Sequence, residues 1–213
     1  MLKQLKQRWE SGDTLVEVLF AITVFSLVVV TSLALMNQGT AASVRSLQMT
    51  LVRQQIDSQA ETLRFLNSAY IAAYYPGYSP NTADASTSPA EEYFNIIQAV
   101  RLKGATSVTA FGGNTGTDCK AAPSGSFIMN TRTARYQAYS GSIMTAADGV
   151  AEVTYDSANG LLNTKGIWIE AVRSAPSGGT SYTDFHIRAC WAAPGLSTPL
   201  NLGTIVRLYE PTA

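Results

Sequence analysis

The chain carries one long uncharged apolar run, Val18–Met36, and this run constrains the fold more than any other feature. It spans nineteen residues, of which only four, all bearing hydroxyl groups, are polar. As an α-helix of that length it would extend about 28 Å, close to the thickness of the hydrocarbon core of a bilayer. Basic residues stand before the run at Lys3, Lys6 and Arg8, and the next charge after it is Arg45. The positive-inside bias therefore predicts one membrane-spanning helix, with the N-terminus in the cytoplasm and the remaining chain outside.

A single carboxylate, Glu17, lies at the cytoplasmic edge of this apolar segment. A charge at the centre of a bilayer costs about 2.5–3.5 kcal/mol on insertion scales, and less near an interface. An acid in a membrane helix is therefore a candidate functional residue, because something must compensate its charge.

Two ordinary alternatives would explain the segment in part. A secretory signal peptide could be cut at Ser32-Leu33-Ala34, although the apolar run is long for such a peptide and contains Glu17 near its start. A plain signal anchor would place Glu17 among the lipid headgroups, where an acid costs little. Neither alternative accounts for the position of Gly12.

Between the basic leader and the apolar run stands the stretch Gly12-Asp13-Thr14-Leu15-Val16-Glu17. It resembles the N-terminal methylation motif of the type IV prepilin family, which comprises pilins and pseudopilins. The resemblance covers about twenty-five residues. It implies that a dedicated membrane enzyme, the prepilin peptidase, cuts between Gly12 and Asp13 and methylates the new amine. Glu17 would be the fifth residue of the mature chain and would pair with the amine of a neighbouring subunit in a filament core. Such an enclosed ion pair specifies register more than it stabilises.

Asp13 stands where the family usually has Phe or Met, so its carboxylate is expected to compete with Glu17 for the new amine. The family's proline in the apolar run is also missing, since no proline occurs between Leu2 and Tyr75. We therefore predict one helix of about sixty residues. Its first part, 13–36, would be the membrane and filament-core helix, and its second part, 37–75, the amphipathic continuation.

The apolar positions of segment 37–75 recur at helical spacing and predict a stripe that packs on a head domain. They are Val44, Leu47, Leu51, Val52, Ile56, Ala60, Leu63, Leu66 and Tyr70. The helix should end at Tyr75-Pro76-Gly77. For the nearby tyrosines 70, 74, 75 and 78 we favour aromatic packing over the stacking of a bound base or sugar.

Segment 76–125 is predicted to be a connecting loop with one short helix, opened by the capping box Ser88-Pro89-Ala90-Glu91 and ending near Lys103. Segment 126–213 reads as an antiparallel β head. The candidate strands are Ser126–Asn130, Arg135–Tyr139, Val150–Tyr155, Gly166–Arg173, Tyr182–Trp191 and Thr204–Tyr209. The predicted fold class is α+β: a long N-terminal helix, membrane-spanning first and then amphipathic, packed on this sheet. The pilin resemblance implies the same architecture.

Cys119 and Cys190 both follow the apolar run, and in an exported domain they are expected to form one disulfide. The alternative is two unrelated buried thiols in a reduced protein. His186 has no plausible acid–base partner in the sequence, so we expect it to be structural. It is the only histidine, and no Cys/His cluster has metal-ligand spacing, so we expect no metal or cofactor. The formal charge is zero, and −2 without residues 1–12, so no nucleic-acid partner is predicted.

These observations and the resemblance predict a non-enzymatic subunit of a type IV pilus or pilus-like filament, processed after Gly12 and assembled through its N-terminal helix. The implied partners are the prepilin peptidase, other pilin subunits and an inner-membrane assembly platform. The chain would lie first in the cytoplasmic membrane as a single-pass protein and then in a filament at the cell surface. Two alternatives stay open: a pseudopilin of a type II secretion or DNA-uptake system, and a membrane-anchored surface module that binds a glycan or protein and never polymerises.

Overall fold

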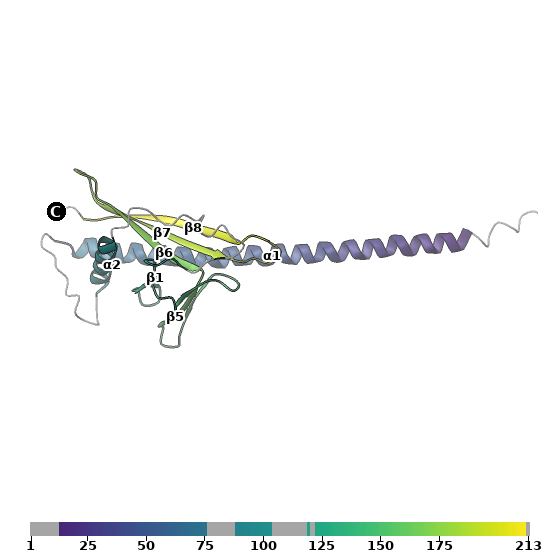
Figure 1. Cartoon of the computed structure of the whole chain (residues 1–213), viewed down its shortest axis with the longest axis horizontal. Coiled ribbons are helices and arrows are strands. Elements are labelled where there is room, and N and C mark those ends of the chain that lie inside the picture. Colours follow the sequence, from purple (N-terminus) through teal and green to yellow (C-terminus); the bar gives the residue numbers. More distant parts are fainter. Residues whose placement is uncertain (1–12, 76–87, 104–118, 120–121, 212–213) are drawn as a thin grey trace, which may run out of the picture. The chain divides into compact units, whose positions relative to one another are not determined.

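The structure, a computed structural model, describes residues 13–75, 88–103, 119 and 122–211 (Figure 1). The chain divides into two compact units, residues 1–45 and 46–213, which are considered separately below. Gly12, Tyr78 and most of the loop predicted between Pro76 and Ser88 lie outside the described residues.

Helix α1 spans Asp13–Ala73, 61 residues without a break, as the sequence predicted. It ends shortly before Pro76, because a proline disfavours helical conformation in the residue that precedes it. In the described part of the chain it is the one helix long and apolar enough to cross a membrane.

The second unit contains the amphipathic part of α1, and its apolar stripe is buried from Val52 onward. The buried members are Val52, Ile56, Ala60, Leu63, Leu66 and Tyr70. The prediction was wrong for the start of the stripe, because Leu47 is 60% exposed and Leu51 is 45% exposed. Helical spacing identifies a face, but only the neighbouring elements decide how far along the helix that face is covered.

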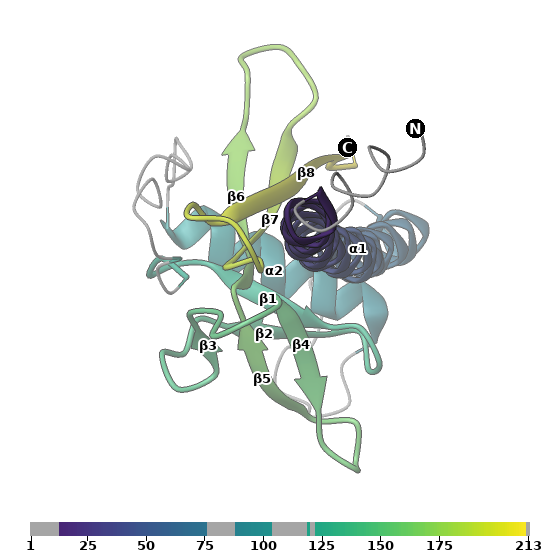
Figure 2. The ribbon, with the colours of Figure 1, turned by 90° about the vertical axis from the view of Figure 1, so that its right-hand side faces the viewer.

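The main sheet has five strands in the order β2-β1-β6-β7-β8, all antiparallel (Figure 2). The strands are β1 Phe127–Asn130, β2 Arg135–Ala138, β6 Ile167–Ser174, β7 Tyr182–Trp191 and β8 Leu200–Tyr209. The predicted fold class, α+β with a long N-terminal helix on an antiparallel sheet, is confirmed. Strand β8 begins four residues earlier than the predicted Thr204.

A second, small sheet has the order β3-β5-β4. Its strands are β3 Met144–Thr145, β4 Glu152–Tyr155 and β5 Leu161–Lys165. Of these, the sequence predicted only β4. The two-residue β3 is too short to show a pattern, and it pairs with β5 in parallel, so the head is not wholly antiparallel.

Helix α2, Pro89–Lys103, begins with the predicted capping box. The backbone N–H of Ser88 donates to Oε2 of Glu91 at 2.6 Å, and the N–H of Glu91 donates to Oγ of Ser88 at 3.3 Å. These bonds satisfy donors that a helix start leaves open.

The core of the head lies between α1, α2 and the main sheet, and it is rich in large aromatic side chains. Trp191, Tyr93, Phe127 and Phe185 are fully buried there. Trp168 is also fully buried, but on the opposite face of the sheet, where it lies opposite Arg188 in the β6–β7 register.

The tyrosines at the end of α1 partly follow the predicted aromatic packing. Tyr70 is buried, and its ring centroid lies 5.5 Å from that of Tyr93 and 5.8 Å from that of Tyr74. Tyr75, by contrast, is 59% exposed.

The predicted disulfide joins Cys119 to Cys190 on β7. It ties the segment that follows α2 to the sheet, across a sequence separation of 71 residues. Stable disulfides form in oxidising compartments, so the bond favours an extracytoplasmic location for the head.

Candidate functional site

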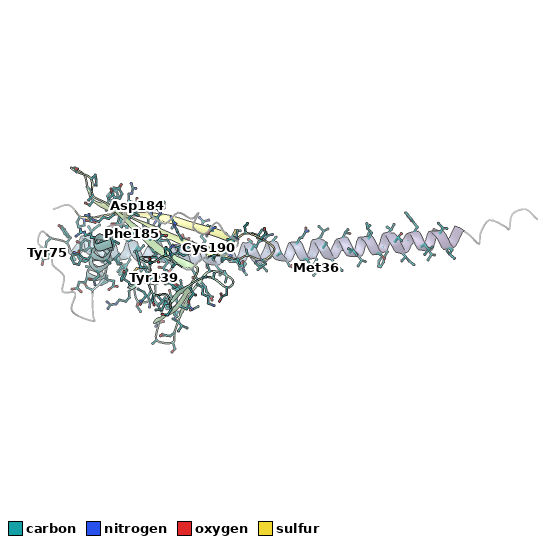
Figure 3. All side chains as sticks on the ribbon, in the orientation of Figure 1. Met36, Tyr75, Tyr139, Asp184, Phe185 and Cys190 are labelled. Carbon is teal, nitrogen blue, oxygen red and sulfur yellow. A yellow bond between two sulfur atoms is a disulfide. The ribbon has the colours of Figure 1, made fainter. Side chains whose placement is uncertain are left out.

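The first candidate site is the N-terminal part of α1, whose apolar side chains are exposed on every face. Phe20, Phe25 and Leu35 are 70%, 69% and 68% exposed, and none of the most apolar window of α1 is buried inside the chain. The side chains of this part of the helix, Met36 among them, are drawn in Figure 3. A helix that is apolar all round belongs in lipid or inside a larger assembly.

Three of the four hydroxyl groups within this segment bond to their own helix. Oγ1 of Thr23 donates to the carbonyl of Phe20 and Oγ of Ser26 to the carbonyl of Ile22, both at 2.7 Å. Thr31 donates in the same way to the carbonyl of Leu27, at 2.9 Å. These side chains therefore need no further partner in an apolar medium, where an unsatisfied polar group is costly.

Glu17 is exposed, and no described residue forms a hydrogen bond or ion pair with it. An ionised carboxylate only accepts hydrogen bonds, so it needs donors or a cation when it leaves water. Within this segment Glu17 is thus the charged group whose partner must come from elsewhere. Asp13 is the first residue of α1, but its side chain lies outside the described part, so its competition with Glu17 stays a prediction, as does cleavage after Gly12.

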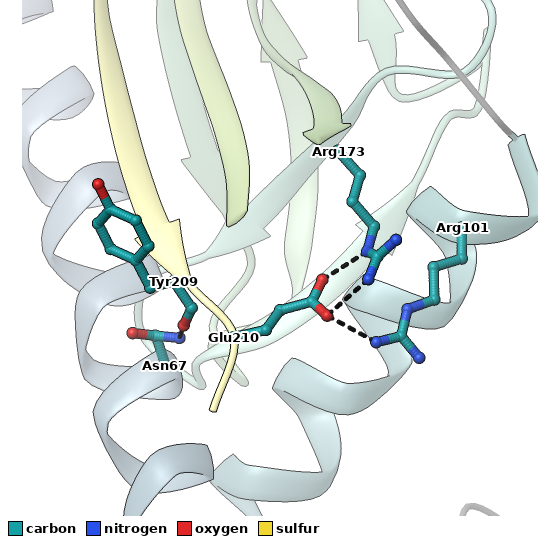
Figure 4. Close-up of polar contacts among 5 residues, drawn as sticks. All are labelled: Asn67, Arg101, Arg173, Tyr209 and Glu210. Carbon is teal, nitrogen blue, oxygen red and sulfur yellow. Dashed lines mark hydrogen bonds and ion pairs between the residues drawn. The ribbon is translucent and has the colours of Figure 1, made fainter. Parts of the chain in front are cut away.

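The second unit contains a buried carboxylate that joins three elements (Figure 4). Glu210, just beyond β8, accepts two bonds from Arg173 of β6, at 2.6 and 2.8 Å. Arg101 of α2 donates a third bond at 2.8 Å. Burial raises the pKa of the Glu210 carboxyl, but the bonds and charges of the two guanidinium groups outweigh burial and hold that pKa below its usual value.

At the other end of α2, Glu92 covers the outer edge of strand β2. Its Oε1 accepts the backbone N–H of Tyr136 at 2.5 Å, and its Oε2 pairs with Arg135 at 3.3 Å. Carboxylates thus connect α2 to the head near both of its ends.

Amide side chains of α1 make similar bonds to strand backbones. Gln59, 1% exposed, accepts the N–H of Met129 and donates to its carbonyl, both at 2.9 Å. Gln55 accepts the N–H of Val153 on β4 at 2.7 Å. Sequence reasoning missed both residues, because glutamines on a helix are usually solvated.

The spacing of Gln59 could have revealed it. The residue stands three positions after Ile56 and four before Leu63, on the buried stripe itself. A polar residue within such a stripe predicts a bonded, buried amide.

The outer face of the main sheet carries a shallow groove of about 700 Å³ along β7 and β8. Its lining residues are His186, Ile187, Arg188, Asn201, Leu202, Gly203, Thr204 and Ile205. Burial and the charge of Arg188 lower the pKa of His186 despite the nearby Asp184 and Glu170, which favours the neutral imidazole at pH 7. Arg188 pairs with Glu170 at 3.4 Å. The groove therefore presents no net charge.

Among the described residues, no three His, Cys, Asp or Glu side chains gather closely enough to hold a metal ion.

No protein-family model, curated protein or solved structure matches this chain. The architecture itself, a long apolar N-terminal helix with an antiparallel, disulfide-linked head, is consistent with a pilin-like fold. The finer resemblance depends on the residues from Gly12 to Glu17 and the apolar run that follows them.

Proposed function

We propose that this protein is a structural, non-enzymatic subunit of a type IV pilus or a related filament. The observation that carries the proposal is an apolar helical segment, exposed on all faces, whose charged group is the carboxylate of Glu17. Lipid can receive such a helix before assembly, and a bundle of identical helices can receive it afterwards.

Processing after Gly12 would supply the partner that Glu17 needs. Cleavage there creates a primary amine on Asp13, and a protonated amine is both a cation and a hydrogen-bond donor. A free amine at the start of a helix meets the positive end of the helix dipole, which disfavours it. A carboxylate of a neighbouring subunit would relieve both the lone amine and the lone acid, and would fix the axial register between the two helices.

The head would form the outer surface of the filament. Its disulfide and its buried carboxylate–guanidinium contacts are features of a domain that must stay folded outside the cell. The membrane segment and the head thus have separate roles, assembly and exposure.

The first test is the mass of the intact mature chain from the native host. A chain that begins at Asp13 supports processing by a prepilin peptidase. A chain that begins near Leu35 identifies an ordinary secretory signal and contradicts the proposal.

The second test replaces Glu17 in the host. Glu17→Ala should leave membrane insertion unchanged and abolish incorporation into sheared filaments, measured by immunoblot of the membrane and filament fractions. Asp57→Ala, an exposed acid further along the same helix, is the matched control and should be incorporated normally. Normal incorporation of Glu17→Ala or Glu17→Leu would instead favour a plain membrane anchor.

A further inference from the structure

Strand β8 forms one edge of the main sheet, and its outward backbone groups can be identified from two hydrogen bonds. The N–H of Cys190 donates to the carbonyl of Gly166, which directly precedes β6, so this residue of β7 faces β6. Backbone groups alternate in direction along a strand, and the β7–β8 register pairs Cys190 with Asn201. The odd-numbered residues of β8 therefore direct their N–H and C=O groups to the free edge. The bond from Asn67 to the carbonyl of Tyr209 agrees with this assignment.

Side chains cover outward backbone groups of three other strands of the head, whereas most of the β8 edge has no such cover among the described residues. Glu92 covers β2, Gln55 covers β4 and Gln59 covers β1. Along β8 only the carbonyl of Tyr209 is bonded in this way, and no described residue bonds the outward backbone groups of residues 201, 203, 205 and 207.

Strand β8 also lacks the features that usually protect an edge strand. It pairs regularly with β7 over ten residues, without a bulge, and contains no proline or lysine. Its one charged residue, Arg207, is held by both oxygens of Asp184, at 2.7 and 2.8 Å. Ile205 is 61% exposed. A long, regular edge of this kind, whose one charge is paired, is a template for an added strand.

Symmetry argues against a second copy of the chain as the occupant. Helix α1 contacts the sheet through Gln48 and Trp191 at one end and through Asn67 and Tyr209 at the other, so it runs in the same direction as β8. Antiparallel pairing of two β8 edges needs a two-fold axis perpendicular to the sheet, which reverses this helix direction in one copy. Copies anchored in one membrane, as proposed above, share one helix direction.

A two-fold axis along the strand would keep the helix direction but would not form a good ladder. Such an axis would place each outward-facing residue of one β8 strand directly opposite the same residue of the other. In a parallel ladder each residue instead bonds to residues offset along the partner strand. Pairing of β8 with β2 of another copy meets Glu92, which already covers that edge. Among the partners that the described strands offer, a segment of a different protein therefore fits the β8 edge better than a second copy does.

We infer that the β8 edge binds an extended segment of a different protein, which adds a sixth strand to the sheet through residues 201–207. The neutral groove beside the edge indicates the chemistry of that segment. Gly203 stands opposite Arg188 and leaves space next to the edge, and Arg188 is neutralised by Glu170. An uncharged strand with a small or apolar side chain at every second position fits this surface.

The test uses the full chain in detergent micelles and a blocked, uncharged peptide of alternating threonine and valine as the probe. Hydrogen exchange is measured at the amides of Gly203, Ile205 and Arg207. They should exchange freely in the protein alone and at least about tenfold more slowly with the peptide, since pairing protects them. The same peptide, N-methylated at every residue, has no backbone N–H to donate on either edge and should have no effect.

Two substitutions at one position separate backbone pairing from side-chain contact. Ile205→Pro removes an outward N–H that β7 does not use, and should weaken peptide binding about fivefold, the effect of one hydrogen bond. Ile205→Thr keeps the N–H and should change binding less than about twofold. Tryptophan fluorescence of the head confirms folding, and if the proline variant unfolds, Gly203→Lys is used as the edge-blocking variant.

Three outcomes would overturn the inference. The amides of β8 could already be protected in the protein alone, which would mean that the chain covers its own edge. They could be protected only as the concentration of the protein rises, which would identify self-association. The peptide could leave their exchange unchanged, in which case β8 is not a template for an added strand.

Discussion

The contact between Glu210 and its two arginines makes a quantitative prediction about the stability of the head. The Glu210 side chain is 9% exposed, whereas Arg173 and Arg101 are 25% and 39% exposed. Breaking a fully buried ion pair costs about 3–5 kcal/mol, and an exposed pair contributes about 0–1 kcal/mol. Because both guanidinium groups keep some contact with water, we expect Glu210→Gln to lower the free energy of unfolding by about 2 kcal/mol. The melting temperature should fall by about 4–8 °C.

The pH dependence gives the same prediction a second test. The pKa of Glu210 is lower in the folded chain than its usual value, so the folded state binds the proton less readily than the unfolded state does. The stabilisation is therefore complete above about pH 5, near the ordinary range of a glutamate, and is lost as the pH falls through the lowered pKa. The difference in stability between wild type and Glu210→Gln should be constant from pH 7 to pH 5 and should shrink below pH 4.

The assay is thermal unfolding of the full chain in detergent, followed by the fluorescence of the buried Trp168 and Trp191. Glu61→Gln is the control, since it removes a carboxylate from an exposed ion pair with Arg64 and should cost less than about 0.5 kcal/mol. A loss for Glu210→Gln as small as that of the control would refute the reasoning. So would a difference from wild type that persists unchanged at pH 3.

Two further substitutions test the packing of the head by the same melting assay. Gln59→Leu should lower the free energy of unfolding by about 2–3 kcal/mol, because the N–H and carbonyl of Met129 would lose their partner inside the core. The control Gln54→Leu, at an exposed position, should be nearly neutral. Equal effects of the two substitutions would contradict the role of Gln59. Gly166→Ala should cost at least about 3 kcal/mol, since φ is +64° there and the added Cβ would collide with the backbone carbonyl oxygen of Cys190. A variant as stable as wild type would show that the β6–β7 junction can shift.

Sequence reasoning succeeded where a local rule determines the structure. The capping box predicted the start of α2 at Pro89, because both of its hydrogen bonds lie within four residues. The uninterrupted spacing of α1 predicted one helix, and Pro76 predicted where it stops. The disulfide followed from two cysteines and an export signal.

It failed where the outcome depends on residues that are distant in the chain. The exposure of Leu47 and Leu51 depends on where the sheet ends, which helical periodicity does not encode. The buried role of Glu210 requires Arg101, which is 109 residues away, and Arg173, which is 37 residues away. Neither separation leaves a local pattern. Glu17 is the opposite case: its motif is local, while its partner is expected in another molecule.

The distribution of satisfied polar groups supports the assignment of assembly to the N-terminal part of α1. In the head, the buried carboxylates Glu210 and Glu92 are both bonded within the chain. Thr23 and Ser26 of the apolar segment are likewise bonded to their own helix. Glu17 is the exception, since no described residue bonds it and its surroundings are apolar side chains that lipid or other helices must cover. A carboxylate is acceptable in a headgroup layer but costly in a dry helical bundle. In the proposed filament, Glu17 would therefore make assembly conditional on a cation supplied by the neighbouring subunit. Such a requirement would exclude unprocessed chains, which lack the free amine on Asp13, from the filament.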